Sequence, residues 1–232
     1  MKTSVKKVLA VVMGVALVGY AISFATAGSS SSALHNTGFL GDYYKKLKPG
    51  PGKGDPKFMW MKPGTDFTKY KKVMVDYVVF ALAEDAEYKG IDANVAKQIG
   101  DNASLALINA LRDVHFPVVS EPGPDVLRVR TAIINLKPSK PGLSTVTSVV
   151  PVGLAFSLLH KGAKGTFTGA GATDAEMMVL DSMTNEVLAC GQDHKDAKFG
   201  ERFSKWGSVK EAFESFGGRL AQRVVYFTTK KK

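Results

Sequence analysis

Cysteine is nearly absent from this chain, which has one among its 232 residues, Cys190. A lone cysteine excludes an intrachain disulfide, so the fold must be held together by its hydrophobic core. The preceding residues, Val187, Leu188 and Ala189, favour a strand, and we expect a buried, unreactive thiol there. Hydrophobic residues make up 45% of the chain, which is an ordinary share for a globular protein.

The motifs of nucleotide, metal and nucleophile chemistry are also missing. The glycines between 162 and 171 precede a strand pattern and lack the Gly-Lys-Ser/Thr that opens a P-loop helix. The four histidines are far apart, with no His-Glu-x-x-His pair, and there is no Gly-x-Ser-x-Gly elbow. We therefore expect no cofactor, no bound metal and no catalytic residue, and the residues favour a protein that is not an enzyme.

One polar cluster keeps a catalytic alternative open. Asp193, His194 and Asp196 lie close together near the end of a predicted strand. They would serve an envelope hydrolase only if the fold held the three side chains within hydrogen-bond reach in one pocket. Neighbouring residues of a strand point to opposite faces, which favours a simple polar strand end instead.

The first 27 residues have the pattern of a Sec export signal. Three lysines lie within the first seven residues, an apolar run covers 8–24, and a small-x-small cleavage site ends at Ala27. Cleavage between Ala27 and Gly28 would leave a periplasmic or secreted protein. Retention is the alternative, since residues 8–27 have about the 20-residue length that spans a bilayer and would anchor the body outside the cytoplasm. A bacterial lipoprotein needs cysteine where this chain has Gly28, so we expect no lipid anchor.

Charge is unbalanced in favour of basic residues: 31 lysines and arginines oppose 21 acidic residues, for a net charge of +10. Export argues against nucleic acid as a partner, so the excess charge indicates anionic lipid or an acidic envelope polymer. A solvated basic segment is the alternative, because charge runs are usually solvated. The candidate contacts lie between residues 45 and 72: Lys45, Lys46, Lys48, Lys69, Lys71 and Lys72.

Residues 28–69 are predicted to form a flexible leader followed by an arm rich in Gly, Pro and Lys. The composition of residues 38–63 predicts neither a helix nor an internal strand. Large apolar side chains are nevertheless interleaved there, so we expect the arm to lie docked across the domain. The candidates for an interaction surface are its aromatic residues: Phe39, Tyr43, Tyr44, Phe58 and Trp60.

Residues 70–232 are predicted to form one α+β domain. Its elements follow from alternating and helical apolar patterns: strand 70–82, helix 92–112, strands 116–120 and 126–136, hairpin 174–181 with 186–193, and helix 208–227. The first strand is apolar on both faces and should be central. Asp92 and Ser208 are the expected helix caps, and Asn185 suits a left-handed turn. This order predicts a single mixed or antiparallel sheet of about four to five strands, with two or three helices packed mainly on one face and the apolar run 146–159 packed on the sheet.

Four segments, taken in order, resemble a known group of bacterial envelope proteins. They are residues 38–43, 62–76, 122–130 and 176–189. Through them the chain is similar to the DUF3313 family, whose members are often described as lipoproteins. The resemblance covers nearly all of the chain after residue 27 and implies no established activity and no catalytic residue. The chain departs from the family at Gly28, where members commonly have the lipid-bearing cysteine, and at Asn185, where the turn usually has glycine.

Export, the missing catalytic motifs and the aromatic arm together favour a non-catalytic accessory or assembly module of the cell envelope. Its expected partners are an envelope protein or a second copy of itself. The hydrolase built on Asp193, His194 and Asp196 and the basic module that binds anionic lipid or polymer are the alternatives.

Overall fold

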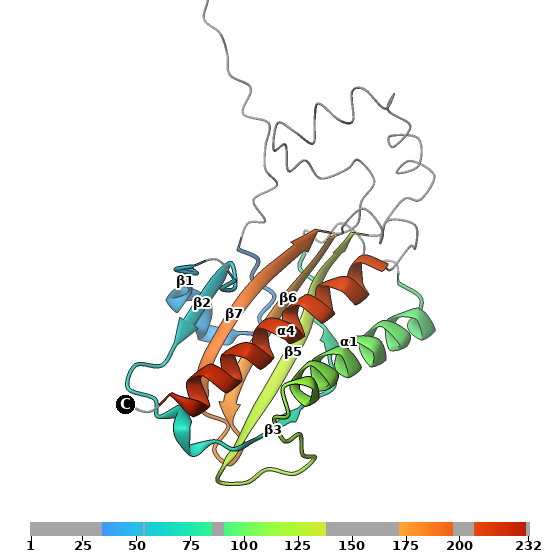
Figure 1. Ribbon diagram of the computed structural model, residues 1–232. Coiled ribbons are helices and arrows are strands. Elements are labelled where there is room, and N and C mark those ends of the chain that lie inside the picture. The colour runs from blue at the N-terminus through green and yellow to red at the C-terminus, as the bar shows by residue number, and fades with distance from the viewer. Residues whose placement is uncertain (1–33, 53, 85–90, 138–171, 197–206, 231–232) are drawn as a thin grey trace, which may run out of the picture. The chain divides into compact units, whose positions relative to one another are not determined.

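A seven-stranded mixed sheet forms the centre of the fold (Figure 1). It is seen in a computed structural model that describes residues 34–52, 54–84, 91–137, 172–196 and 207–230. The strands run in the order β1-β2-β7-β6-β5-β3, with β4 also paired to β5. They are β1 (Lys48–Pro49), β2 (Phe58–Met61), β3 (Lys72–Val75), β4 (Val79–Phe80), β5 (Val126–Lys137), β6 (Ala172–Asp181) and β7 (Val187–Asp196). Only β3 and β4 run parallel to their neighbour β5, and the other pairs are antiparallel.

Two long helices, α1 (Ala93–Asp113) and α4 (Gly207–Thr229), lie side by side on one face of the sheet (Figure 1). Asp92 caps α1, as predicted, by accepting hydrogen bonds from the backbone N–H groups of Asn94 and Val95 at 2.9 and 3.3 Å. The apolar stripe of each helix faces the sheet and forms the larger core with it. Its most deeply buried members include Leu107, Leu111, Phe213, Val129 and Ile133.

We call residues 34–61 the N-terminal segment. Its first part, residues 34–47, covers the opposite face of the sheet, and its second part contributes β1 and β2 to the sheet. The 3-10 helix η1 (Gly41–Lys46) places Leu40 and Tyr44 over Met178, Leu180 and the other members of a second, smaller apolar cluster. Leu40 is fully buried and Tyr44 is 9% exposed, so the predicted docking of the arm is confirmed. The described residues therefore form three layers: two helices, the sheet and the N-terminal segment.

The single mixed sheet of an α+β fold is confirmed, but it has seven strands where about four to five were expected. The expectation that residues 38–63 contain neither a helix nor an internal strand is wrong, because the 3-10 helix η1 lies there and β2 lies between β1 and β7. The Gly and Pro residues lie mainly in the turn before β2, where Gly50 N–H donates to the Lys57 carbonyl at 3.0 Å. That turn leaves the four apolar residues of β2 free to pair.

The expected central strand 70–82 is also wrong in position. The chain forms β3 and β4 instead, at the edge of the sheet, with residues 76–78 between them. The strand is apolar on both faces although it is not central. The segment 117–119 lies along its outer edge, pairs with it through Val73 and Val118, and so shields β3 from solvent. The predicted strand 116–120 is reduced to that single bridge.

Several local predictions are confirmed and others lie outside the described residues. Asn185 has the left-handed φ of 58° that the hairpin turn requires. Helix α4 is described from Gly207, and the predicted cap at Ser208 depends on a side chain outside the described ones. The signal region 1–27, the apolar run 146–159 and the glycines from 162 to 171 are not among the described residues. In the part of the chain that the structure describes, no helix is long and apolar enough to span a bilayer.

Candidate functional site

The three residues of the hydrolase hypothesis do not meet in one pocket. Asp193 lies on the helix-covered face of β7, where it pairs with Arg219 of α4 and accepts a hydrogen bond from Lys57 N–H at 3.3 Å. His194 and Asp196 lie on the other face, because side chains alternate along a strand. The required approach of all three side chains is therefore not observed.

His194 belongs instead to a polar cluster on the ends of β5, β6 and β7. Its Nδ1 lies 2.5 Å from Oδ1 of Asp174, the residue directly opposite on β6. Asp196 Oδ1 lies 3.1 Å from Nε2, outside hydrogen-bond geometry, and Asn135 donates to Asp174 at 3.0 Å. The hydrogen bond to Asp174 and the charge of Asp196 raise the pKa of His194 to about 9. Within the described ranges, no group of three or more His, Cys, Asp or Glu side chains is arranged to hold a metal ion.

A buried carboxylate fastens the N-terminal segment to the sheet. Glu176, on β6, is fully buried and accepts hydrogen bonds from Thr37 Oγ1 at 2.7 Å, Tyr44 Oη at 2.9 Å and Gln192 Nε2 at 2.8 Å. Burial raises its pKa, and the hydrogen bonds oppose that rise. Because two of the three donors come from the N-terminal segment, this network holds that segment to the sheet.

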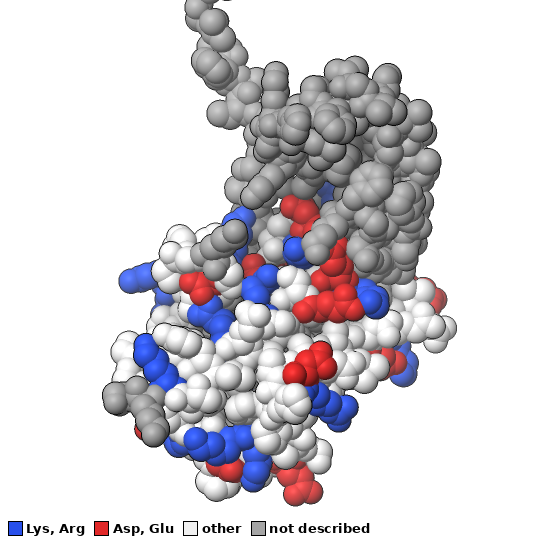
Figure 2. Space-filling model, viewed as in Figure 1, with Lys and Arg blue, Asp and Glu red and all other residues white. Residues whose placement is uncertain are grey.

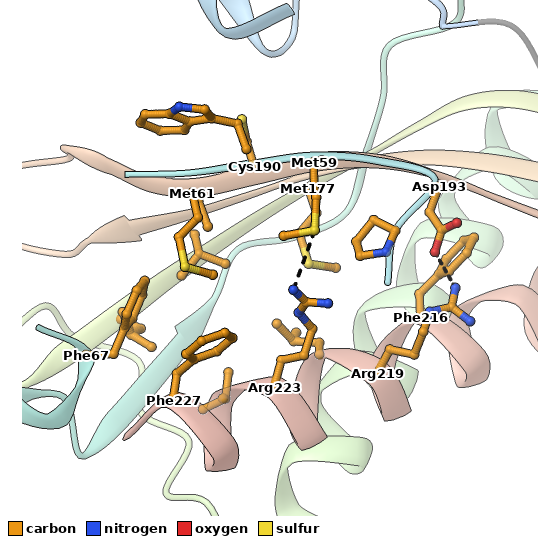
Figure 3. A pocket seen from close by; sticks show the side chains of 18 of the residues that line it. Met59, Met61, Phe67, Met177, Cys190, Asp193, Phe216, Arg219, Arg223 and Phe227 are labelled. Atoms are coloured by element: carbon orange, nitrogen blue, oxygen red, sulfur yellow. Dashed lines mark hydrogen bonds and ion pairs between the residues drawn. The ribbon is translucent and has the colours of Figure 1, made fainter. Parts of the chain in front are cut away.

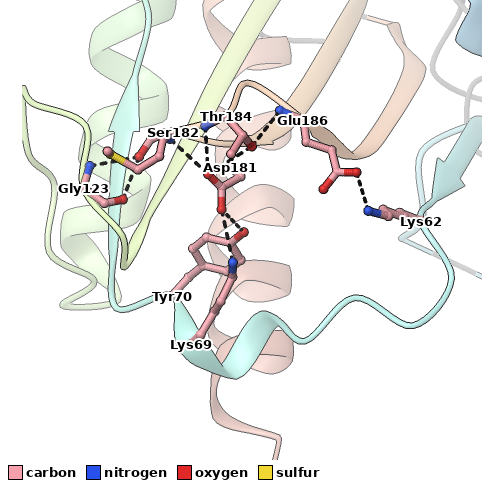
Figure 4. A network of polar contacts seen from close by, with 9 residues as sticks. Lys62, Lys69, Tyr70, Gly123, Asp181, Ser182, Thr184 and Glu186 are labelled. Atoms are coloured by element: carbon pink, nitrogen blue, oxygen red, sulfur yellow. Dashed lines mark hydrogen bonds and ion pairs between the residues drawn. The ribbon is translucent and has the colours of Figure 1, made fainter.

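A second carboxylate organises the β6–β7 turn (Figure 4). Asp181 Oδ2 accepts from Tyr70 Oη at 2.8 Å and Lys69 Nζ at 3.2 Å, while Oδ1 accepts from Thr184 N–H at 3.1 Å. Burial opposes ionisation of Asp181, but these donors outweigh it and lower its pKa to about 2. Burial and the charged acceptor raise the pKa of Tyr70 to about 12. Both carboxylate oxygens of Asp181 accept hydrogen bonds, one set from the turn and the other from the chain before β3. Asp181 thus joins these two segments, and we call this arrangement a structural clamp.

The aromatic residues predicted for an interaction surface lie together, with one exception. Phe39, Tyr43 and Trp60 are half-buried around the smaller apolar cluster, and the Tyr43 and Trp60 rings lie 4.9 Å apart between centroids. Lys46 Nζ lies 4.5 Å from the Tyr43 ring and 5.0 Å from the Trp60 ring. Tyr44 points inward to Glu176 and is structural. Phe58 lies on β2, and the cluster does not include it.

The six candidate lysines do not form one patch. All are exposed, but Lys48 lies on β1 and Lys72 on β3, at opposite edges of the sheet. Lys69 and Lys72 are also ion-paired, with Asp181 and Asp125. On the face that carries α1 and α4, basic and acidic side chains are intermixed around a broad area of other residues (Figure 2). Along the chain the six fall into two groups, Lys45, Lys46 and Lys48 on one side of the sheet and Lys69, Lys71 and Lys72 on the other, and the second group includes the two ion-paired lysines.

An apolar pocket lies between α4 and the strands β2, β6 and β7 (Figure 3). It encloses about 120 Å³. Met59, Met61 and Met177 extend from the sheet towards α4, and Phe216 and Phe227 face them (Figure 3). Two arginines of α4, Arg219 and Arg223, border the same space. Sequence reasoning missed this pocket, because its walls come from elements far apart in the chain.

The lone cysteine behaves as predicted. Cys190 is 5% exposed, lies on the side of β7 away from the pocket methionines and contributes to the smaller apolar cluster (Figure 3). Burial raises the pKa of its thiol to about 12. Since the thiolate is the reactive form of cysteine, this thiol is inert at neutral pH.

Three comparisons with known proteins bear on the identity of the chain. No curated protein matches it. Among solved structures, the PelC dodecamer of Paraburkholderia phytofirmans is 11% identical, with a TM-score of 0.40 over 75% of this chain and 98% of that one. A DUF330 protein of Xanthomonas campestris is 9% identical, with a TM-score of 0.38 over 72% and 90%. A DUF4136 protein of Bacteroides thetaiotaomicron is 11% identical, with a TM-score of 0.35 over 75% and 96%.

These TM-scores and identities are low and add nothing to the assignment. The assignment rests on a protein-family model, described as "Protein of unknown function (DUF3313)", which matches residues 35–220. The match begins in the N-terminal segment and ends within α4, so it includes every strand described above. The chain therefore belongs to the DUF3313 family, as its motifs predicted.

Proposed function

We propose that the protein is an exported, non-catalytic module of the cell envelope that binds another envelope protein through its N-terminal segment. The observation that carries the proposal is the contact between the half-buried rings of Tyr43 and Trp60 on that segment, with the exposed Lys46 ammonium over both rings. Tyrosine and tryptophan are enriched among the residues that dominate binding energy in protein interfaces. Phe39 extends the same surface, which we call the aromatic surface: Phe39, Tyr43, Lys46 and Trp60.

The aromatic surface is held in place before any partner arrives. The Tyr44–Glu176 hydrogen bond fixes η1, and pairing of β2 with β7 fixes Trp60 opposite Cys190. A surface that is already ordered loses less conformational entropy on binding. The fixed positions of η1 and Trp60 therefore support a binding role for the aromatic surface.

The sheet edges favour a contact through side chains over strand addition. The edge strand β1 has two residues and contains Pro49, which has no N–H to donate. The other edge, β3, is covered by the segment around Val118. Short, proline-containing or covered edges oppose pairing with a second chain. A partner, or a second copy of this chain, is thereby directed to the aromatic surface.

The polar clusters support a role without catalysis. The carboxylates of Asp181 and Glu176 are each saturated by hydrogen bonds within the fold, and Asp193 is paired with Arg219. The export signal at residues 1–27 supports a location outside the cytoplasm, either after cleavage at Ala27–Gly28 or with the signal retained as an anchor.

The test is cross-linking in intact cells followed by recovery through a C-terminal tag. The double variant Tyr43→Ala/Trp60→Ala should lose the cross-linked partner while remaining folded, which circular dichroism of the purified variant verifies, although the loss of packing lowers its melting temperature. Tyr226→Ala is the matched control, because Tyr226 is an equally large aromatic residue, 53% exposed on α4. Recovery of the same partner from the double variant, or of wild-type protein without any partner, contradicts the proposal.

The anionic-surface alternative is separated in the same material. Lys46 of the aromatic surface and its neighbours Lys45 and Lys48 are the group that would contact lipid or polymer. Binding to phosphatidylglycerol vesicles that falls steeply between 50 and 300 mM salt would favour that alternative. We expect little vesicle binding at either salt concentration.

A further inference from the structure

Small residues create the apolar pocket between α4 and the sheet. Ala175, Ala189 and Gly191 form its floor on β6 and β7, where larger side chains would fill the space under the helix. Gly191 is required for a second reason, since a Cβ there would lie 2.7 Å from the Phe58 carbonyl oxygen of β2. The close approach of β2 and the open floor therefore depend on the same residue.

The walls of the pocket are adaptable. Met59 and Met61 on β2 and Met177 on β6 are half-buried and border it. Methionine side chains are flexible and polarizable, and they are common in hydrophobic surfaces that accept varied ligands. An apolar cavity of roughly 150 Å³ holds a molecule the size of benzene. The enclosed 120 Å³ thus suits the end of a hydrocarbon chain, with the remainder lying along the opening.

The two arginines provide the polar end of the site. Arg219 and Arg223 lie one turn apart on α4, and both border the pocket. Arg219 pairs with Asp193, and Arg223 pairs with Asp55 through one guanidinium nitrogen. The other terminal nitrogen of Arg223 donates to the Met59 sulfur at 3.6 Å (Figure 3). A thioether is a weak acceptor, so this guanidinium has a donor that a stronger acceptor would satisfy better.

We propose that this pocket binds a single-chain anionic amphiphile. The hydrocarbon chain enters between Met59, Met177 and Phe216, and a carboxylate or phosphate head replaces the Met59 sulfur as the acceptor of Arg223. A fatty acid and a lysophospholipid share this chemistry. The site is independent of the aromatic surface, because Met59 and Trp60 are successive residues of β2 and point to opposite faces of the sheet.

The experiment is titration calorimetry of the full chain with decanoate, decyl phosphate and uncharged decan-1-ol. Wild type should bind at least one of the anions at least about tenfold more tightly than the alcohol, as expected for a charge-assisted hydrogen bond. Decanoate represents the fatty acid and decyl phosphate the lysophospholipid head, and binding of either supports the proposal. Their ratio identifies the source.

Three variants test the geometry. Ala189→Phe fills the floor and should weaken every probe at least about tenfold, and Ala189→Leu gives a smaller filling if the first variant unfolds. Arg223→Met keeps an apolar chain and should lower binding of the anions to that of decan-1-ol. Arg112→Met, on the exposed end of α1, is the matched control and should bind as wild type does. Circular dichroism verifies the fold of each variant.

Three results would overturn the proposal. The first is that neither anion binds the wild type with a dissociation constant below 1 mM. The second is equal affinity for anion and alcohol, or unchanged anion binding by Arg223→Met, which removes the assigned role of the arginine. The third is wild-type affinity in folded Ala189→Phe or Ala189→Leu, which places the probe elsewhere.

Discussion

The hydroxyl of Tyr44 lies 2.9 Å from Oε2 of Glu176, and this hydrogen bond joins residues 132 positions apart in the chain. The same hydroxyl accepts from the Thr37 and Leu40 N–H groups at 3.1 and 3.3 Å. One side chain therefore connects the turn before η1 with a fully buried carboxylate on β6. The N-terminal segment is fixed by buried polar contacts as well as by apolar burial.

Tyr44→Phe removes that connection and should lower the free energy of unfolding by about 1–3 kcal/mol at pH 7.5. The loss should be smaller at pH 4, because the donor stabilises the ionised form of Glu176, whose pKa is raised by burial. Urea unfolding at both pH values measures the difference. Tyr43→Phe is the matched control and should change stability less. An equal loss for Tyr44→Phe at both pH values would show that the carboxylate is not the relevant partner.

His194 should make the folded protein less stable at alkaline pH. Its folded pKa of about 9 lies above the ordinary value of 6.5, so its contribution is complete below pH 6.5 and is lost as the pH rises through 9. The expected loss is on the order of 2–3 kcal/mol. His194→Gln should flatten this part of the pH profile, whereas His115→Asn, at an exposed position with a left-handed φ, should not. Urea unfolding at pH 6, 7.5 and 9.5 decides between the two profiles.

Much of the fold was predictable because its signals are local. The cap at Asp92, the alternation along β5, the turn residue Asn185 and the apolar stripe of α4 each lie within one element or one turn. The strands of the N-terminal segment were missed because their order comes from pairing with β7, well over a hundred positions away. A short apolar run after a Gly/Pro turn does not reveal such a partner.

The candidate sites were less predictable for the same reason. The sequence indicated the aromatic residues of the N-terminal segment, but it did not distinguish the inward Tyr44 from the half-buried Tyr43 beside it. The pocket needs small residues on two strands and arginines on α4, and no single stretch of sequence contains both. Its local signal in α4 was the spacing of Arg219 and Arg223, which places both arginines on one side of the helix.

Asp181 should give the opposite pH dependence to His194. Its folded pKa of about 2 lies below the ordinary value of 3.8, so its contribution is present above pH 3.8 and is lost as the pH falls through 2. Asp181→Asn should cost about 2–3 kcal/mol at pH 7 and clearly less at pH 2.5. Asp125→Asn breaks only the partly exposed pair with Lys72 and should cost less than about 1 kcal/mol. Similar costs for the two variants at pH 7 would contradict the clamp.

Two adjacent glycines of α4 provide a test of helix packing. A Cβ at Gly217 would lie 3.0 Å from both the Ala106 carbonyl oxygen and Ala110 Cβ of α1, whereas a Cβ at Gly218 would meet nothing within 4 Å. Gly218→Ala should therefore stabilise the protein by about 0.5–1 kcal/mol through helix propensity. Gly217→Ala gains the same propensity but pushes the helices apart, so it should be at least about 1 kcal/mol less stable than Gly218→Ala. Equal stabilisation by both substitutions, measured by urea unfolding, would rule out the close helix crossing.

The position of β2 also determines the order in which the chain can fold. Its partner β7 lies near the other end of the chain, and Lys57 N–H bonds to Asp193 across 136 positions. Because the N-terminal part is synthesised first, Met59, Met61 and Trp60 have no sheet to join until β7 has followed. Contacts of such long range slow folding, because the loop must close before they form. The last part of the fold to assemble is therefore the first part of it to be made, and the apolar residues of β2 stay unpaired during that interval.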